Sequence, residues 1–147
     1  MPISARVAWE TVQQPQTLRY ITRGLLGFRI DGRLPPRFAQ GETYRMRLML
    51  FGFIPAWRHE ITIVRLDDAG REILTSEHGG SVKTWNHHIT VDELGPYRSR
   101  YTDAIEVGAG LLTPLVWAYA QLFFRYRQWR WRRLARTLAA QLPAGSA

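Results

Sequence analysis

Four polar side chains that could take part in chemistry occur in the middle of the sequence, in stretches that alternate apolar and polar residues. They are His59, Glu77, His87 and Asp103, and all four occupy odd-numbered positions. The large apolar residues of these stretches are also at odd positions, and side chains of one parity share one face of a β-strand. The sequence therefore predicts that the four groups point into the interior together with the apolar side chains.

Buried imidazole and carboxyl groups must form hydrogen bonds or lose their charge, so the role of these side chains has three interpretations. They could form a structural hydrogen-bond network, or a polar patch that orients a ligand in an apolar cavity. They could also form a metal site or a general acid and base, with His87, Asp103 and His59 as the catalytic candidates. No recognised ligand spacing occurs, so we predict no metal ion and no cofactor.

The spacing of two strands suggests that His87 and Asp103 interact directly. A short turn near Gly95 joins the two stretches, and a hairpin centred there brings His87 opposite Asp103 and Trp85 opposite Ile105. Cross-strand neighbours have Cβ atoms about 4.5–5.5 Å apart, which is close enough for an imidazole–carboxylate hydrogen bond. We therefore predict this bond inside the protein.

The totals are typical of one globular domain over residues 1–147. The chain has no cysteine, which excludes disulfides, thiolate metal sites and a cysteine nucleophile. The N-terminus lacks a basic segment followed by an apolar one, so we expect no signal peptide and a cytoplasmic protein. The net charge is +8, and the part after Glu106 contributes six arginines and no acid.

Hydrophobic periodicity predicts strands through most of the chain. A half-buried strand is expected at residues 3–9, two short helical turns at 10–14 and 16–23, and a short edge strand at 28–30. Five longer strands follow at 43–51, 57–66, 71–78, 82–93 and 98–107. Strands this close in sequence pair antiparallel, because parallel pairing needs longer crossovers.

A long helix is predicted from Thr113 to residue 142. Thr113 and Pro114 suit the start of a helix, and no Gly or Pro follows until Pro143. Its first half is apolar nearly all round, so we expect that half to be buried on most of its surface, either in the core of this chain or against a partner. The sheet should curl around this helix and leave a cavity, which Tyr119 and Phe123 would line.

The end of this helix, residues 125–142, is basic. Its arginines, among them Arg127, Arg130, Arg132 and Arg133, could contact an anionic membrane or, less in keeping with the sequence, nucleic acid. The alternative is a solvated helix end whose arginine stems cover apolar surface while their charges stay in water.

The order of elements resembles the SRPBCC superfamily, which includes START lipid-transfer domains and the birch-pollen allergen family. The resemblance is strongest at residues 101–106 (YTDAIE), the Gly-Ala-Gly linker and residues 122–127 (LFFRYR). It implies an α+β helix-grip fold, in which a curved antiparallel sheet of six to seven strands wraps around a long C-terminal helix.

The resemblance also implies an apolar cavity for a lipid-like or polycyclic ligand. The expected function is non-catalytic binding or transport of a small hydrophobic molecule. Two alternatives are a cyclase- or hydrolase-like enzyme and a membrane- or nucleic-acid-docking module; the sequence does not determine the oligomeric state. The residues expected to line the ligand site are His59, Glu77, Trp85, His87, Tyr101, Asp103, Tyr119 and Phe123.

Overall fold

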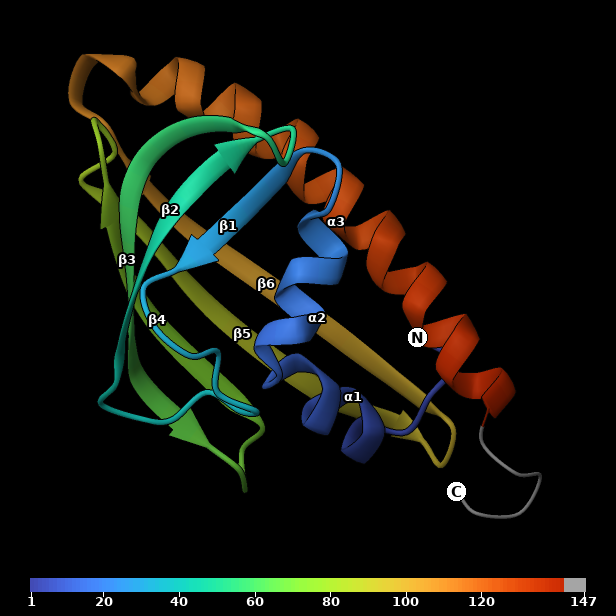
Figure 1. Ribbon diagram of the computed structural model, residues 1–147. Helices are drawn as coiled ribbons and strands as arrows, with labels where there is room; N and C mark the ends of the chain where they lie inside the picture. Colours follow the sequence, from blue (N-terminus) through green and yellow to red (C-terminus); the bar gives the residue numbers. More distant parts are fainter. Residues whose placement is uncertain (142–147) are drawn as a thin grey trace.

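A single antiparallel sheet and one long helix dominate the protein. The computed structural model describes residues 1–141 and contains six strands in the spatial order β1-β2-β3-β4-β5-β6 (Figure 1). The elements are α1 (Ala5–Val12), α2 (Pro15–Thr22), β1 (Leu26–Ile30), β2 (Thr43–Leu50), β3 (Ile54–Asp67), β4 (Glu72–Gly79), β5 (Thr84–Gly95), β6 (Arg98–Gly108), a 3-10 turn (Gly110–Leu112) and α3 (Thr113–Gln141). The predicted α+β architecture, a curved antiparallel sheet with a long C-terminal helix, is therefore confirmed.

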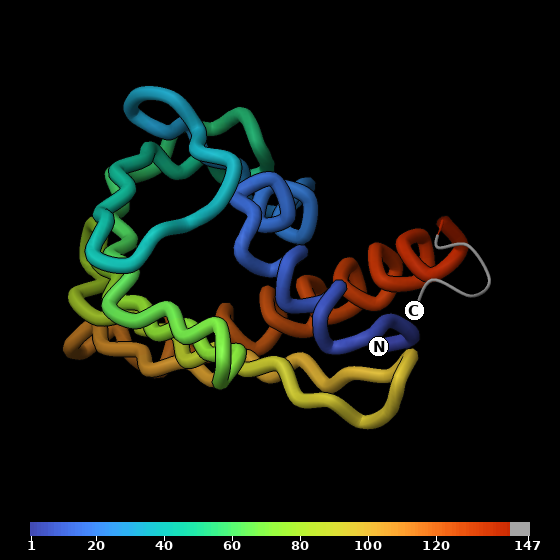
Figure 2. Tube along the Cα trace, turned by 90° about the horizontal axis from the view of Figure 1, so that it is seen from below, coloured from blue at the N-terminus to red at the C-terminus, as the bar shows by residue number. Residues whose placement is uncertain are grey.

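The sheet curves into a half-barrel whose concave side faces the helices. Register shifts interrupt the pairing of β2 with β3, of β3 with β4, and of β5 with β6. Bulges of this kind bend a strand and increase its twist. Figure 2 shows the result: the strands form a curved wall, and α2 and α3 lie across its open side. The space enclosed between wall and helices holds the candidate site.

The N-terminal segment is helical, so the predicted strand at residues 3–9 is wrong. The Ser4 hydroxyl caps α1 by accepting a hydrogen bond from the backbone N–H of Val7. Ala5, Ala8, Trp9 and Val12 are buried at helical spacing. Small and apolar residues at these positions fit the two-residue period of a strand as well as the 3.6-residue period of a helix. The Ser4 cap and the packing of this segment against β5 and β6 favour the helix. Pro15 then begins α2, close to the second predicted turn.

The long helix α3 follows its prediction, and residue 142, its expected end, lies outside the described residues. Its burial differs from the expectation. In the apolar first half, Leu115 and Leu122 are 71% and 69% exposed. The buried face consists of Ala120, Phe123, Arg127, Trp131 and Ala135, most of it in the second half. Within residues 1–141 only one side of that half contacts the rest of the protein, so the first half is not a helix buried inside the core, and burial of its other side against a partner stays a prediction.

Odd-numbered side chains of β4, of β3 from His59 to Ile63 and of β5 up to Val91 face the interior, as predicted. Beyond the register shift in β3, Arg65 is exposed and Leu66 packs against the core instead. Ile61, Ile63, Ile73, Ile89 and Val91 are buried in one core cluster that also includes Trp9 and Trp131. The core is therefore densest where α1 and the second half of α3 meet the sheet. No helix within residues 1–141 is long and apolar enough to cross a membrane.

Candidate ligand cavity

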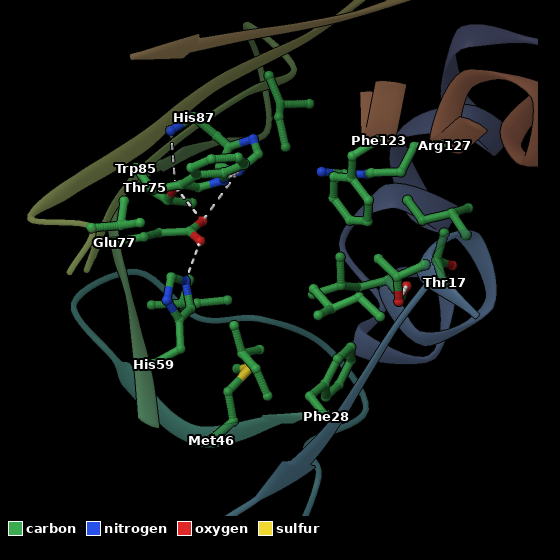
Figure 3. A pocket seen from close by; sticks show the side chains of 18 of the residues that line it. Thr17, Phe28, Met46, His59, Thr75, Glu77, Trp85, His87, Phe123 and Arg127 are labelled. Carbon is green, nitrogen blue, oxygen red and sulfur yellow. Dashed lines mark hydrogen bonds and ion pairs between the residues drawn. The ribbon is translucent and has the colours of Figure 1, made fainter. Parts of the chain in front are cut away.

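A cavity of ≈ 420 Å³ lies between the concave face of the sheet and the helices. Side chains from all three helices and from every strand of the sheet line it, and most are aliphatic or aromatic (Figure 3). They include Leu18, Ile21, Phe28, Met46, Leu48, Ile61, Ile63, Ile73, Trp85, Ile89, Tyr119 and Phe123. A site of this volume and lining is typical of pockets for small apolar molecules.

Polar side chains gather on one wall of this cavity, along neighbouring strands. The Nε2 atom of His59 on β3 lies 3.0 Å from Oε2 of Glu77 on β4. The hydroxyl of Thr75 donates to Oε1 of the same carboxyl group at 2.7 Å. Nε2 of His87 on β5 is 3.7 Å from that oxygen. These groups are buried, so the wall is a continuous polar band on an otherwise apolar surface.

Asp103 lies behind this band, where its carboxyl group interacts with three side chains through two hydrogen bonds and one ion pair. Its Oδ1 is 2.7 Å from Nδ1 of His87, and its Oδ2 accepts a hydrogen bond from the Tyr101 hydroxyl at 3.0 Å. The guanidinium of Arg127, on α3, is 3.3 Å from the same Oδ2. Because the side chains of Asp103 and Arg127 are only 6% and 7% exposed, this is a buried ion pair between sheet and helix.

The predicted His87–Asp103 bond is confirmed, but the predicted register is wrong. His87 is opposite Ile105, and Asp103 is opposite Ile89, so the pairing is shifted by two residues. The turn is centred on Pro96 and Tyr97 rather than on Gly95, because Gly95 pairs with Arg98. The irregularity between Glu93 and Gly95 then moves the pairing by one residue, which restores the predicted parity. A shift of two leaves every side chain on its face, and the diagonal neighbours still reach each other.

Trp85 determines the protonation pattern of His87. The indole Nε1 of Trp85 is 3.0 Å from His87 Nε2, and an indole nitrogen can only donate. Nε2 therefore accepts, and Nδ1 carries the proton that is donated to Asp103. In this state His87 is neutral, and both of its ring nitrogens are occupied.

Nearby charges shift the pKa of both His87 and Asp103. Burial opposes protonation of His87, but the charges of Asp103 and Glu77 outweigh it, so its pKa is raised. Burial also opposes ionisation of Asp103, yet His87 and Arg127 hold the pKa of this carboxyl group below its ordinary value. Burial, assisted by Asp103, raises the pKa of Tyr101, which keeps its hydroxyl protonated as a donor.

An NMR titration of His87 is expected to give a pKa above the ordinary value of about 6.5. Asp103→Asn should lower it, because the substitution removes the nearest negative charge. Since the raised pKa belongs to the folded state, the contribution of this proton to the unfolding free energy is complete below the ordinary pKa. It is lost as pH rises through the raised pKa. Asp92→Asn, at an exposed position, should not change the titration; an equal shift in both variants would contradict the assignment.

Comparison with known proteins identifies a family. The model for a domain of unknown function, DUF8410, matches residues 4–138, nearly the whole chain. The chain belongs to the DUF8410 family. No curated protein is significantly similar in sequence.

Two solved structures resemble this DUF8410 chain in fold. One is a conserved protein from Geobacillus kaustophilus, with 14% identity and a TM-score of 0.62, which covers 93% of this chain and 91% of its own. The other is the protein TTHA0849 from Thermus thermophilus, with 14% identity and a TM-score of 0.58, covering 97% and 94%. At this identity the similarity shows the fold alone.

In the DUF8410 chain, seven of the eight residues predicted for the ligand site line the cavity. The eighth, Asp103, does not line the cavity but forms a hydrogen bond with His87, which does. Sequence reasoning missed Thr75, whose hydroxyl completes the polar band. Thr75 is at an odd position on β4, two residues before Glu77, and this parity would have predicted that its side chain also points inward. Within residues 1–141 no group of three or more His, Cys, Asp or Glu side chains is arranged to hold a metal ion.

Two of the four arginines predicted to contact an anionic surface are engaged inside the protein. Arg127 lines the cavity, pairs with Asp103 and stacks 4.8 Å above the ring of Phe124. Arg130 donates to the carbonyl of Tyr20 and stacks on its ring at 4.4 Å. Only Arg132 and Arg133 of the predicted set are exposed. The difference arises because both engaged arginines lie on the side of α3 that faces the sheet and α2.

Proposed function

We propose that this protein binds a small, largely apolar molecule in the cavity between sheet and α3 and acts as a carrier or sensor for it. The observation that supports this function most directly is the cavity itself, which is large, apolar and crossed by one polar band. We further propose that the chain is related to the SRPBCC superfamily, as residues 101–127 suggest. Such a relationship would place the ligand in this same space.

The arrangement at His87 favours binding over catalysis. A His–Asp pair acts as a general base through the imidazole nitrogen that does not face the carboxylate. In His87 that nitrogen is Nε2, and it accepts the indole N–H of Trp85 at 3.0 Å. A substrate would have to displace this bond before His87 could take a proton. The polar band is therefore better suited to orienting a ligand than to proton transfer.

Titration with Nile red, a neutral apolar dye, tests the proposal. We expect saturable binding of one dye per protein and its displacement by apolar molecules. Figure 3 shows the side chain of Met46 pointing into the cavity, so Met46→Trp should fill the space and weaken dye binding at least about tenfold, roughly 1.4 kcal/mol. Val64→Trp, at an exposed position on β3, is the matched control. Absence of dye binding, or equal effects of both variants, would overturn the proposal.

Attachment to an anionic membrane is a second candidate function, which the outer side of α3 favours. Leu115, Leu122 and Trp129 recur every seven residues and therefore lie on one side of the helix. They are 71%, 69% and 53% exposed. Exposed aliphatic and tryptophan side chains in one stripe are typical of helices that lie in a membrane interface.

The charges around this stripe favour lipid headgroups over a second copy of the chain. Arg125, Arg132, Arg133 and Arg136 are exposed on α3, and none forms an ion pair within residues 1–141. A dimer through this face would bring the arginines of both copies to one interface, and α3 carries no acidic residue that could pair with them. Anionic headgroups would neutralise them while the leucines enter the apolar layer. Leu115 also lines the cavity, so the attached face would adjoin its mouth.

Cosedimentation with vesicles measures this attachment. We expect the protein to sediment with vesicles containing phosphatidylglycerol at low salt and not with pure phosphatidylcholine, because the interaction is electrostatic and screened by salt. Changing the four exposed arginines of α3 to Gln should abolish sedimentation with little effect on stability. The control is a second fourfold Gln variant with the same change in charge, at the exposed residues Arg29, Arg47, Arg58 and Arg100.

Three results would contradict the membrane function. The wild-type protein could fail to sediment with anionic vesicles, or the control variant could lose sedimentation equally. A dimer in solution that Leu122→Ser converts to monomer would instead assign this face to a second copy of the chain.

A further inference from the structure

We infer that the polar end of the ligand is a hydrogen-bond donor, a hydroxyl or amino group, which Glu77 accepts, and that ligands with an anionic end are rejected. This inference rests on the proposed ligand-binding function and specifies the chemical class of the ligand. It follows from an inventory of donors and acceptors on the polar wall of the cavity.

Glu77 is a buried carboxyl group with unused acceptor capacity. Two side chains donate to it, the Thr75 hydroxyl at 2.7 Å and His59 Nε2 at 3.0 Å. An ionised carboxylate offers about four lone-pair sites, so about two are left. His87 Nε2, at 3.7 Å, cannot use them, because Trp85 donates to that nitrogen. Glu77 therefore presents free acceptor sites to the cavity that it lines.

The neighbouring His59 has a hydrogen-bond partner at only one of its two ring nitrogens. Its Nε2 carries the proton that is donated to Glu77. Its Nδ1 is buried and has no partner within residues 1–141. A second proton on Nδ1 would leave a buried N–H donor without an acceptor, which costs free energy, whereas an unprotonated Nδ1 leaves only a lone pair unused. The surroundings of His59 Nδ1 therefore offer no acceptor for a proton on that atom.

The hydrogen-bond donors on this wall are already engaged. The Trp85 indole donates to His87, His87 donates to Asp103, and the Thr75 hydroxyl donates to Glu77. A ligand that offers only acceptors would therefore find no partner on the polar wall. A ligand that offers a donor would find Glu77.

The fixed charges around the cavity also disfavour an anion. Figure 3 shows Glu77 and Arg127 on opposite sides of the cavity. Arg127 pairs with Asp103 at 3.3 Å, and its buried Nε has no hydrogen-bond partner within residues 1–141, whereas Glu77 pairs with no arginine or lysine among these residues. Repulsion between two carboxylates is much stronger in a water-poor cavity than in bulk water. A fatty acid would therefore bind worse than the alcohol of the same chain length.

Competition with bound Nile red at pH 7.5 tests this inference with three probes of equal chain length: 1-decanol, decanoate and decane. We expect 1-decanol to displace the dye at a concentration at least about tenfold lower than decanoate, and also lower than decane. Glu77→Gln should reduce the preference for the alcohol over the acid several-fold, because it removes the negative charge. Glu60→Gln, at a partly exposed carboxyl group that pairs with Arg45, is the matched control and should leave the preference unchanged.

The outcomes separate this inference from the proposed function. If Nile red binds but decanoate competes as well as 1-decanol, the donor assignment is overturned and ligand binding stands. If the dye does not bind, both fail. If Glu77→Gln does not fold, the comparison of the three probes with the wild-type protein decides the question. An unchanged preference in folded Glu77→Gln would show that another group selects the ligand, which also overturns the assignment.

Discussion

Replacing Asp103 by alanine is expected to lower the unfolding free energy by about 3–5 kcal/mol, the range for breaking a buried ion pair by removing one partner. The guanidinium of Arg127 would stay buried against Phe124 without its counterion. The Nδ1–H of His87 and the hydroxyl of Tyr101 would lose their acceptor as well. Urea denaturation at pH 7 measures the change, and the exposed Asp92→Ala serves as control.

A double variant separates the lost ion pair from other effects of the Asp103 substitution. Asp103→Leu combined with Arg127→Met replaces both charged groups by apolar side chains of similar volume, and such replacements are often neutral or stabilising. The double variant should therefore be more stable than Asp103→Ala. A loss below about 1 kcal/mol for Asp103→Ala would mean that the charges are compensated elsewhere and would contradict this network.

The contribution of Asp103 should also depend on pH in a defined direction. Because its pKa in the folded state is lowered, Asp103 stabilises the protein fully at pH values above the ordinary aspartate pKa. The stabilisation is lost as pH falls through the lowered value. The difference in unfolding free energy between wild-type protein and Asp103→Asn should therefore shrink below about pH 4, where the ordinary pKa lies.

Trp131→Ala is expected to cost about 3–5 kcal/mol, the range for truncating a buried aromatic side chain. Trp131 is 3% exposed, belongs to the core cluster and packs with its ring centroid 5.1 Å from that of Tyr101. Trp129 is two residues away on the same helix and is 53% exposed. Trp129→Ala should therefore change stability by no more than about 0.5 kcal/mol, as is usual for surface substitutions.

The two tryptophan variants form a matched pair, because each removes the same side chain from the same helix. Thermal or urea unfolding of both proteins in one buffer gives the difference directly. Equal losses would mean that the Trp131 side of α3 is not the one that contacts the sheet.

The strands and their inward faces could be predicted from the sequence because they depend only on the parity of positions. His59, Glu77 and His87 are at odd positions, and each is buried on the concave face. A register error of two residues left this prediction intact, since it moves a side chain along its strand without changing its face. The centre of the turn at Pro96 and Tyr97, which caused the error, and the irregularity beside it have no clear signal in the local sequence.

The N-terminal segment shows where local pattern was insufficient. Its apolar residues satisfy a period of two and a helical period alike, so periodicity could not distinguish the two structures. Two interactions stabilise the helix over the strand. The Ser4 side chain caps its start, and the Trp9 indole donates a hydrogen bond to Asp68 at 2.7 Å. The partner of Trp9 is far away in the sequence, which is why only the folded chain reveals it.

The sequence by itself determined the length of α3, the alternation that turns four polar groups inward, and the excess of arginine after Glu106. Only the tertiary structure decided which side of α3 is buried, because its first half is apolar nearly all round and composition cannot select a face. Contact with the sheet buries Arg127 and Trp131 and leaves Leu122 and Trp129 in solvent. The physical reason is that this side buries the rings of Phe123 and Trp131 against the sheet and also brings Arg127 within 3.3 Å of the buried Asp103.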